Sequence, residues 1–178
     1  MKWSQESYLK TLTFAAEAHL GQTCPGSDIP YLLHVTLVAM EVMAVFPHEK
    51  DVDEALTLNC ALLHDTLEDT PTTFEALTLH FGQRVAEGVL ALTKNSRLEK
   101  SLQMEDSLGR ILQQPREIGM VKLADRITNL REPPPHWKPE KIREYLEEAR
   151  TILETLKDCS PFLTIRLSDK IEAYKRYL

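Results

Sequence analysis

The stretch ALLHDTLEDT at residues 61–70 holds a histidine and three acidic side chains, and a proline follows it at once. Apolar residues before and within it recur at the spacing of a buried helix face, which predicts a helix over Asp51–Glu68. Proline cannot continue that helix, so the acids lie near its C-terminal end, where the helix dipole disfavours negative charge. Asp65 and Asp69 add a like-charge pair four residues apart. A bound cation is the simplest compensation, and the stretch is therefore a candidate functional site.

Length and composition are those of one ordinary globular unit. The chain has 178 residues, of which 43% are hydrophobic and 27% are charged, and we expect a single domain over residues 1–178. The absence of a long apolar run or apolar leader argues against a membrane partner. A net charge of −6 with no basic block argues against nucleic acid. Three widely spaced cysteines argue against disulfides and against a thiolate zinc site, and they favour the reducing cytoplasm.

The rest of the sequence is typical of helices separated by loops rich in proline and glycine. Helical spacing and capping residues predict further helices over Ser4–Leu20, Tyr31–Phe46, Thr72–Phe81, Arg84–Leu92, Ser101–Leu112, Glu117–Leu130, Pro139–Leu156 and Pro161–Tyr177. No alternating strand pattern and no internal repeat is present. The predicted fold class is all-α, a single compact bundle of about eight or nine helices.

Three of the predicted helices contribute side chains that commonly bind metals. These are His34 on one helix, His64 and Asp65 on the next, and Asp125 on a third. Each has an ordinary explanation when taken alone, such as a buried core histidine or an aspartate paired with a neighbouring lysine. Together, two imidazoles and two carboxylates form a mixed nitrogen and oxygen set that suits Mn, Fe, Co or Zn. The joint pattern therefore predicts one metal centre.

Longer motifs extend this pattern over most of the chain. They are AAEAHLGQ at 15–22, IPYLLH at 29–34, ALLHDTLEDT at 61–70, FG at 81–82, LTK at 92–94 and KLADRITNL at 122–130. The order His, His-Asp, Asp resembles the HD-domain metal-dependent phosphohydrolases, which are all-helical bundles. The full set of motifs is similar to the hydrolase domain of the RelA/SpoT family. Because no synthetase domain follows, the chain resembles the stand-alone small alarmone hydrolases.

The resemblance implies removal of the 3′-pyrophosphate from guanosine tetra- or pentaphosphate, the (p)ppGpp alarmones of the stringent response, usually with Mn²⁺. It implies metal ligands at His34, His64, Asp65 and Asp125, water-handling acids at Glu68 and Asp69, and substrate contacts at Asn129, Lys94, Lys141 and Tyr145. Surface charge for the lysines and core packing for the tyrosine are the alternatives. The implied partner is a small nucleotide, and self-association into a homo-oligomer is left open.

Two positions depart from the pattern of the family. The loop QTCPGSD at 22–28 lacks Lys and Arg, where the family carries a basic residue that stacks on guanine. Val35 follows His34, where the family usually has proline. Losing a guanidinium plane removes a contact that helps to select the base. Guanosine alarmones and adenosine alarmones of the ppApp type are therefore both retained as substrates. A broader HD phosphohydrolase of other nucleoside phosphates and a non-catalytic nucleotide-sensing HD module are the alternative functions.

Overall fold

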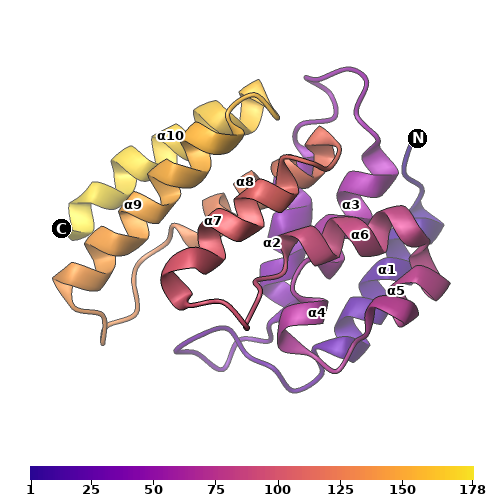
Figure 1. Ribbon diagram of the computed structural model, residues 1–178, viewed down its shortest axis with the longest axis horizontal. Coiled ribbons are helices and arrows are strands. Elements are labelled where there is room, and N and C mark those ends of the chain that lie inside the picture. The colour runs from indigo at the N-terminus through magenta and orange to yellow at the C-terminus, as the bar shows by residue number, and fades with distance from the viewer.

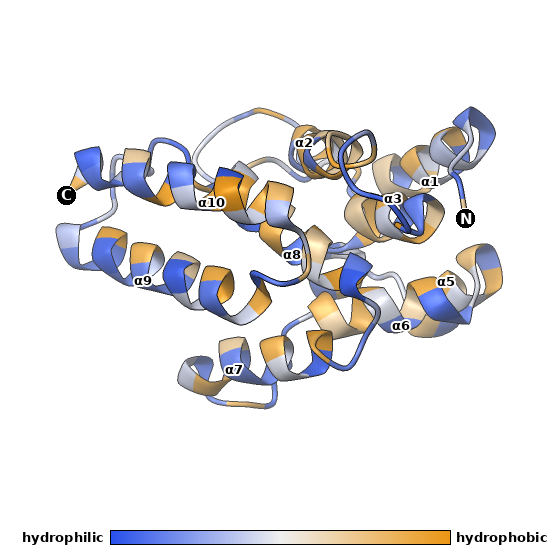
Figure 2. Cartoon of the chain, turned by 90° about the horizontal axis from the view of Figure 1, so that it is seen from above, coloured by the Kyte–Doolittle hydropathy of each residue, from blue (hydrophilic) through white to orange (hydrophobic).

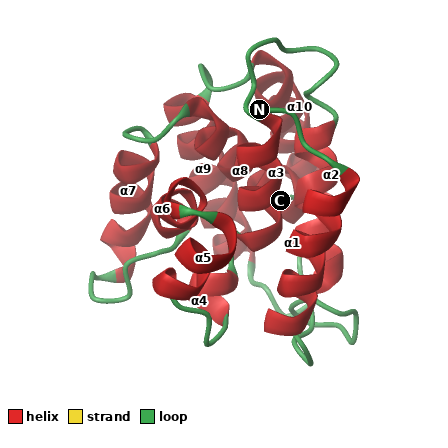
Figure 3. Cartoon of the chain, turned by 90° about the vertical axis from the view of Figure 1, so that its right-hand side faces the viewer, coloured by secondary structure: helices red, strands yellow, loops and turns green.

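The computed structural model describes all of residues 1–178, and the chain forms ten α-helices and one short 3-10 helix (Figure 1). The helices are α1 (Gln5–Ala18), α2 (Leu32–Met43), α3 (Glu54–Leu63), α4 (Thr66–Asp69), α5 (Phe74–Phe81), α6 (Gln83–Leu92), α7 (Lys100–Ile111), α8 (Arg116–Asn129), α9 (Pro139–Leu156), α10 (Pro161–Tyr174) and η1 (Lys175–Tyr177). There is no strand, as Figure 3 shows, and a single bridge joins Thr23 to Pro30. The prediction of an all-α fold is confirmed, and only α4 is as short as a single turn.

The predicted helix over Asp51–Glu68 is wrong in one respect, because the chain breaks at His64 and Asp65. Asp53 caps α3 by accepting the N–H of Leu56 at 3.2 Å, and α3 ends with His64 as its C-cap. Asp65 then precedes the separate turn α4. In a straight helix, successive side chains point about 100° apart. The break instead lets the side chains of His64 and Asp65 meet, with Nε2 and Oδ2 at 2.8 Å.

Helix α8 lies at the centre of the molecule and packs against α2, α3, α6, α9 and α10, as the view in Figure 2 shows for several of them. Nearly every residue of α8 is buried. Gly88 lets α6 approach closely, because a Cβ there would lie 2.6 Å from Cδ1 of Ile118. Each fully buried aliphatic side chain contributes about 1.5–3 kcal/mol to folding. Asp125, on this helix, therefore has a rigid support.

Two carboxylates, the buried Glu41 and the partly buried Glu49, join the C-terminal helices to the rest of the bundle. Glu41 on α2 pairs with Arg166 on α10. Glu49 accepts hydrogen bonds from Oγ of Ser160 at 2.6 Å and from the N–H of Phe162 at 3.1 Å, at the start of α10. These contacts hold α10 against α2 and the loop that follows it. None of the helices combines the length and apolar character that a membrane span needs.

Candidate metal centre and catalytic cavity

Side chains from three helices converge at one buried point. Nε2 of His34 and Nε2 of His64 lie 3.2 Å apart. Oδ1 of Asp125 lies 3.5 Å from the first nitrogen and 3.8 Å from the second. One ligand atom from each of the three residues lies within 4.8 Å of the others, and all three side chains are buried. Atoms this close can share one ion after small adjustments, because metal–ligand distances are about 2.0–2.2 Å.

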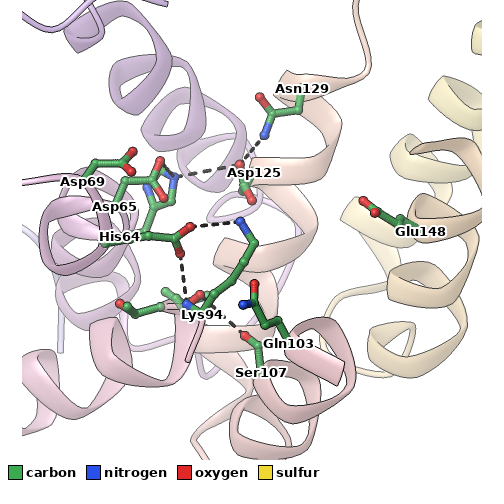
Figure 4. A network of polar contacts seen from close by, with 12 residues as sticks. His64, Asp65, Asp69, Lys94, Gln103, Ser107, Asp125, Asn129 and Glu148 are labelled. Atoms are coloured by element: carbon green, nitrogen blue, oxygen red, sulfur yellow. Dashed lines mark hydrogen bonds and ion pairs between the residues drawn. The ribbon is translucent and has the colours of Figure 1, made fainter. Parts of the chain in front are cut away.

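Asp65, the fourth predicted ligand, lies beside this group. Its Oδ2 is 2.8 Å from Nε2 of His64 and 3.5 Å from Nε2 of His34. The hydroxyl of Tyr31 donates a hydrogen bond to the same oxygen. Figure 4 shows His64, Asp65 and Asp125 gathered between α8 and the helices that carry the first two. The structure thus brings all four predicted ligands together.

A second layer of hydrogen bonds orients the ligands. Nδ1 of His64 lies 2.8 Å from the carbonyl oxygen of Ala61, so it donates there and Nε2 is the nitrogen that faces the cluster. The amide of Asn129 donates to Oδ1 of Asp125 at 2.6 Å, and Nζ of Lys122 donates to Oδ2 at 3.0 Å. Metal-binding histidines and carboxylates typically have such supporting contacts, which fix the tautomer and the direction of the side chain. This arrangement fits a metal centre.

The electrostatics of the cluster favour positive charge between the carboxylates. Burial opposes protonation of His34, but hydrogen bonds to Asp125 and Asp65 outweigh it and raise its pKa to about 9. Burial likewise penalises the ionised form of Asp125, yet Lys122 and the two imidazoles hold its pKa well below the usual range. The buried carboxylate of Asp125 and the partly buried one of Asp65, beside two imidazole nitrogens, therefore match the charge and donor preferences of a divalent transition metal.

A cavity of about 560 Å³ opens over the cluster, and both predicted acids line it. Glu68 is held by Lys94: its Oε1 lies 2.9 Å from Nζ and its Oε2 accepts the backbone N–H at 3.0 Å. Asp69 makes no ion pair. Burial, followed by the charges of Asp65 and Glu68, raises the pKa of Asp69 above its ordinary value. The two acids therefore differ in their partners: Glu68 is paired with a lysine, whereas Asp69 has no cationic partner.

The four predicted substrate contacts, Asn129, Lys94, Lys141 and Tyr145, also line this cavity. Tyr145 faces the cavity and also packs against neighbouring side chains, because its ring lies 4.2 Å from the guanidinium of Arg126 and 5.1 Å from the ring of Trp137. Arg126 is buried and pairs with Glu148 at 3.2 Å, so its charge is already compensated within the protein.

Several residues that line this cavity are not picked out by the helical spacing of the sequence. They are Tyr31, Lys100, Gln103, Trp137 and Glu148. Lys100, Gln103 and Glu148 lie on helices, and the sequence does not show which neighbouring helix each of them faces. For Tyr31, the motif IPYLLH was the one available signal.

A wider hollow of about 930 Å³ between α7 and α9 adjoins the cavity. Glutamates dominate its charged lining, which makes it unsuited to phosphates.

Comparisons with known proteins agree with this geometry. A family model described as HD domain matches residues 11–158. The guanosine-3′,5′-bis(diphosphate) 3′-pyrophosphohydrolase MESH1 of Xenopus tropicalis is 32% identical over 164 residues, which is 89% of this chain and 89% of the relative. MESH1 of Danio rerio is 34% identical over 154 residues, 84% of this chain and 83% of the relative.

Two further comparisons point in the same direction. The bifunctional (p)ppGpp synthase/hydrolase SpoT of Escherichia coli is 37% identical over 123 residues, 66% of this chain but 16% of that protein. A solved structure of a metazoan orthologue of SpoT that hydrolyses ppGpp matches with a TM-score of 0.83 at 26% identity, covering 97% of this chain and 98% of the other. Given the family match over most of its length and relatives above 30% identity that align over most of both chains, this protein belongs to the HD-domain family and, within it, to the group of the MESH1 hydrolases.

Proposed function

We propose that this protein is a metal-dependent 3′-pyrophosphohydrolase of hyperphosphorylated purine nucleotides, with (p)ppGpp as the first candidate substrate and (p)ppApp as the second. One observation carries the proposal: a buried cluster of His34, His64 and Asp125, with Asp65 beside it, lies under a cavity that Glu68 and Asp69 line. The names of the MESH1 relatives support the same reaction.

The ion we propose at this cluster is divalent, with Mn²⁺ preferred, held by His34, His64, Asp65 and Asp125. Mixed imidazole and carboxylate donors suit Mn, Fe, Co and Zn better than Mg or Ca. When bound, a divalent ion supplies Lewis acidity to the phosphoryl oxygen and to the attacking water. The other requirements of the reaction are proton transfer and compensation of the phosphate charges, and side chains on the cavity wall provide both.

Asp69 is the proposed proton acceptor. Its carboxylate makes no ion pair, and burial together with neighbouring negative charge raises its pKa toward the working range of a general base. Glu68 is bound to Lys94 by two contacts, so its main role is to hold that lysine at the cavity wall. This division assigns proton transfer mainly to Asp69 and orientation mainly to Glu68.

Lysines are proposed to bind the phosphates of the substrate. Lys94, Lys100, Lys122 and Lys141 all line the cavity, although the whole chain carries a net charge of −6. Local charge therefore has to compensate the phosphates, because the field of the whole protein repels them. Lys94 and Lys141 also match the family by position, and Asn129 and Tyr145 complete the proposed nucleotide contacts.

Replacing Lys94 by methionine is expected to lower kcat/KM by about 10- to 100-fold, mainly through KM. The reason is the loss of a charge-assisted hydrogen bond of about 1.5–3 kcal/mol to a phosphate. Steady-state kinetics with the alarmone checks this. Lys157→Met is the matched control, since Lys157 also pairs with a glutamate, Glu154 at 3.0 Å, but lies outside the cavity. Equal kinetics of the two variants would remove Lys94 from the binding site.

The proposed function is tested with a small nucleotide panel. Purified protein loaded with Mn²⁺ is incubated with ppGpp, ppApp, GTP and ATP, and products are separated by anion-exchange chromatography. We expect pyrophosphate and the 5′-diphosphate from one or both alarmones. If pyrophosphate is released from neither alarmone, the proposal is wrong. Faster turnover of the 5′-triphosphates would favour a broader phosphohydrolase, whereas binding without turnover would favour a sensing module.

A further inference from the structure

We propose that Gln22 is a positioning residue that holds the carboxylate of Asp69 in place, and that His19 fixes the direction of the Gln22 amide. Asp69 is the acid to which the proposed function assigns proton transfer, so this inference rests on that function. Neither Gln22 nor His19 lines the catalytic cavity. Both therefore act through Asp69 and not by touching the nucleotide.

A chain of hydrogen bonds connects the end of α1 to the turn α4. His19 is the C-cap of α1, and its Nδ1 lies 2.7 Å from Oε1 of Gln22 in the following loop. Nε2 of Gln22 donates to Oδ2 of Asp69 at 3.4 Å. This contact joins segments 47 residues apart in the sequence. Catalytic hydrogen bonds of this length in a free enzyme often shorten when substrate binds.

The donor and acceptor properties of the three side chains decide which group donates in each of these two hydrogen bonds. An ionised carboxylate only accepts hydrogen bonds, so Gln22 has to present its NH₂ group to Asp69. The oxygen of the amide then faces His19, which has to donate from Nδ1. His19 is 4% exposed and its Nε2 has no hydrogen-bond partner, so the contact with Gln22 is the one side-chain hydrogen bond of this ring. A flipped amide would lose both bonds and place its oxygen against the carboxylate.

Asp69 needs this support because its carboxylate lies at the end of a single short turn and has no other hydrogen-bond donor. Helix α4 is four residues long, and the chain turns to extended geometry at Thr70. The charges of Asp65 and Glu68 act on Asp69 from nearby. The amide of Gln22 is the one donor that its carboxylate has. Without it, the acid is free to leave the position that proton transfer requires, and a displacement of about 1 Å can cost about 100-fold in rate.

His19 also packs against the ring of Tyr31, with ring centroids 5.0 Å apart. Tyr31 in turn donates to Asp65. A useful variant therefore has to keep this aromatic contact and remove only the N–H. His19→Phe meets that requirement. Gln22→Met is the corresponding variant for the amide, because methionine keeps the length of the side chain and cannot donate a hydrogen bond.

The test compares these variants by alarmone hydrolysis, metal content and thermal unfolding. We expect Gln22→Met to lower kcat by about 10- to 100-fold while KM and bound metal stay as in the wild type. Gln83→Met is the matched control, since Gln83 also donates to a carboxylate, Glu87 at 2.7 Å, on α6 and outside the cavity. It should leave kcat unchanged.

A double variant tests whether His19 and Gln22 act as one unit. His19→Phe alone should lower kcat by nearly the same factor as Gln22→Met, and the two together should cost no more than either, since linked residues are not additive. If the factors by which the two single variants lower kcat multiply in the double variant, the role of His19 is overturned. An active wild type with unchanged kcat in Gln22→Met, or a loss of metal or fold in that variant, would overturn the role of Gln22. An inactive wild type would overturn the proposed function itself.

Discussion

Replacing Glu68 by glutamine and Asp69 by asparagine in one protein is expected to lower kcat by about 10²- to 10⁴-fold, the usual contribution of general acid–base catalysis. The amides keep the shape of the acids but cannot accept a proton. Neither residue belongs to the buried group of His34, His64 and Asp125. Bound metal, measured by elemental analysis, should therefore equal that of the wild type.

The single variants separate the two acids. Asp69→Asn should account for most of the loss in kcat, because Asp69 is the less compensated carboxylate. Glu68→Gln should act mainly on KM, because it releases Lys94. Glu87→Gln is a matched control on α6, where Glu87 accepts a hydrogen bond from Gln83 away from the cavity. Rates unaffected in the double variant would assign both acids to structure alone.

Replacing His64 by alanine is expected to abolish metal binding and activity and to destabilise the fold by about 3–5 kcal/mol, the cost of removing one partner from a buried ionic group. His64 is 3% exposed and contacts Asp65, Asp125 and His34. Its loss leaves two carboxylates near each other with less compensation. Elemental analysis and urea unfolding of the variant measure the two effects.

His48 provides the control for that variant. It stacks on Phe162 with centroids 5.0 Å apart and lies outside the metal cluster. His48→Ala should keep both metal and activity. A His64→Ala protein that carries a full complement of metal and unfolds at the wild-type urea concentration would contradict the ligand assignment.

The sequence predicted the helices well because prolines and capping residues mark most of their ends. Pro139 and Pro161 begin α9 and α10 as predicted, and Thr73 caps α5 one residue after the predicted start at Thr72. The break after α3 was missed because apolar spacing continues across it, from Leu63 to Leu67. A change of backbone direction over two residues leaves no trace in a pattern that averages over whole turns.

The residues of the site likewise fall into a group that the sequence predicted and a group that it did not. The candidate ligands were predicted because imidazole and carboxylate groups within apolar helices are rare enough to notice. The polar contacts of Asp65 with Tyr31 and of Asp69 with Gln22 were not predicted, because Tyr31 and Gln22 lie in or next to a loop, where partners depend on tertiary structure. Arg126 has the charge of a phosphate ligand, yet it packs against Tyr145 and pairs with Glu148, which sequence alone does not show.

The stretch 61–70 is divided between two helices: His64 is the C-cap of α3, whereas Glu68 and Asp69 lie on the separate turn α4. Glu68 and Asp69 are exposed, so substitutions at these two positions leave the central packing of α3 and α8 intact. Under the proposed assignment, a lineage of such proteins can exchange or discard the acids of proton transfer and still inherit the folded scaffold that carries the candidate metal cluster. Divergence from enzyme to receptor then requires few substitutions, all at exposed positions of one short turn.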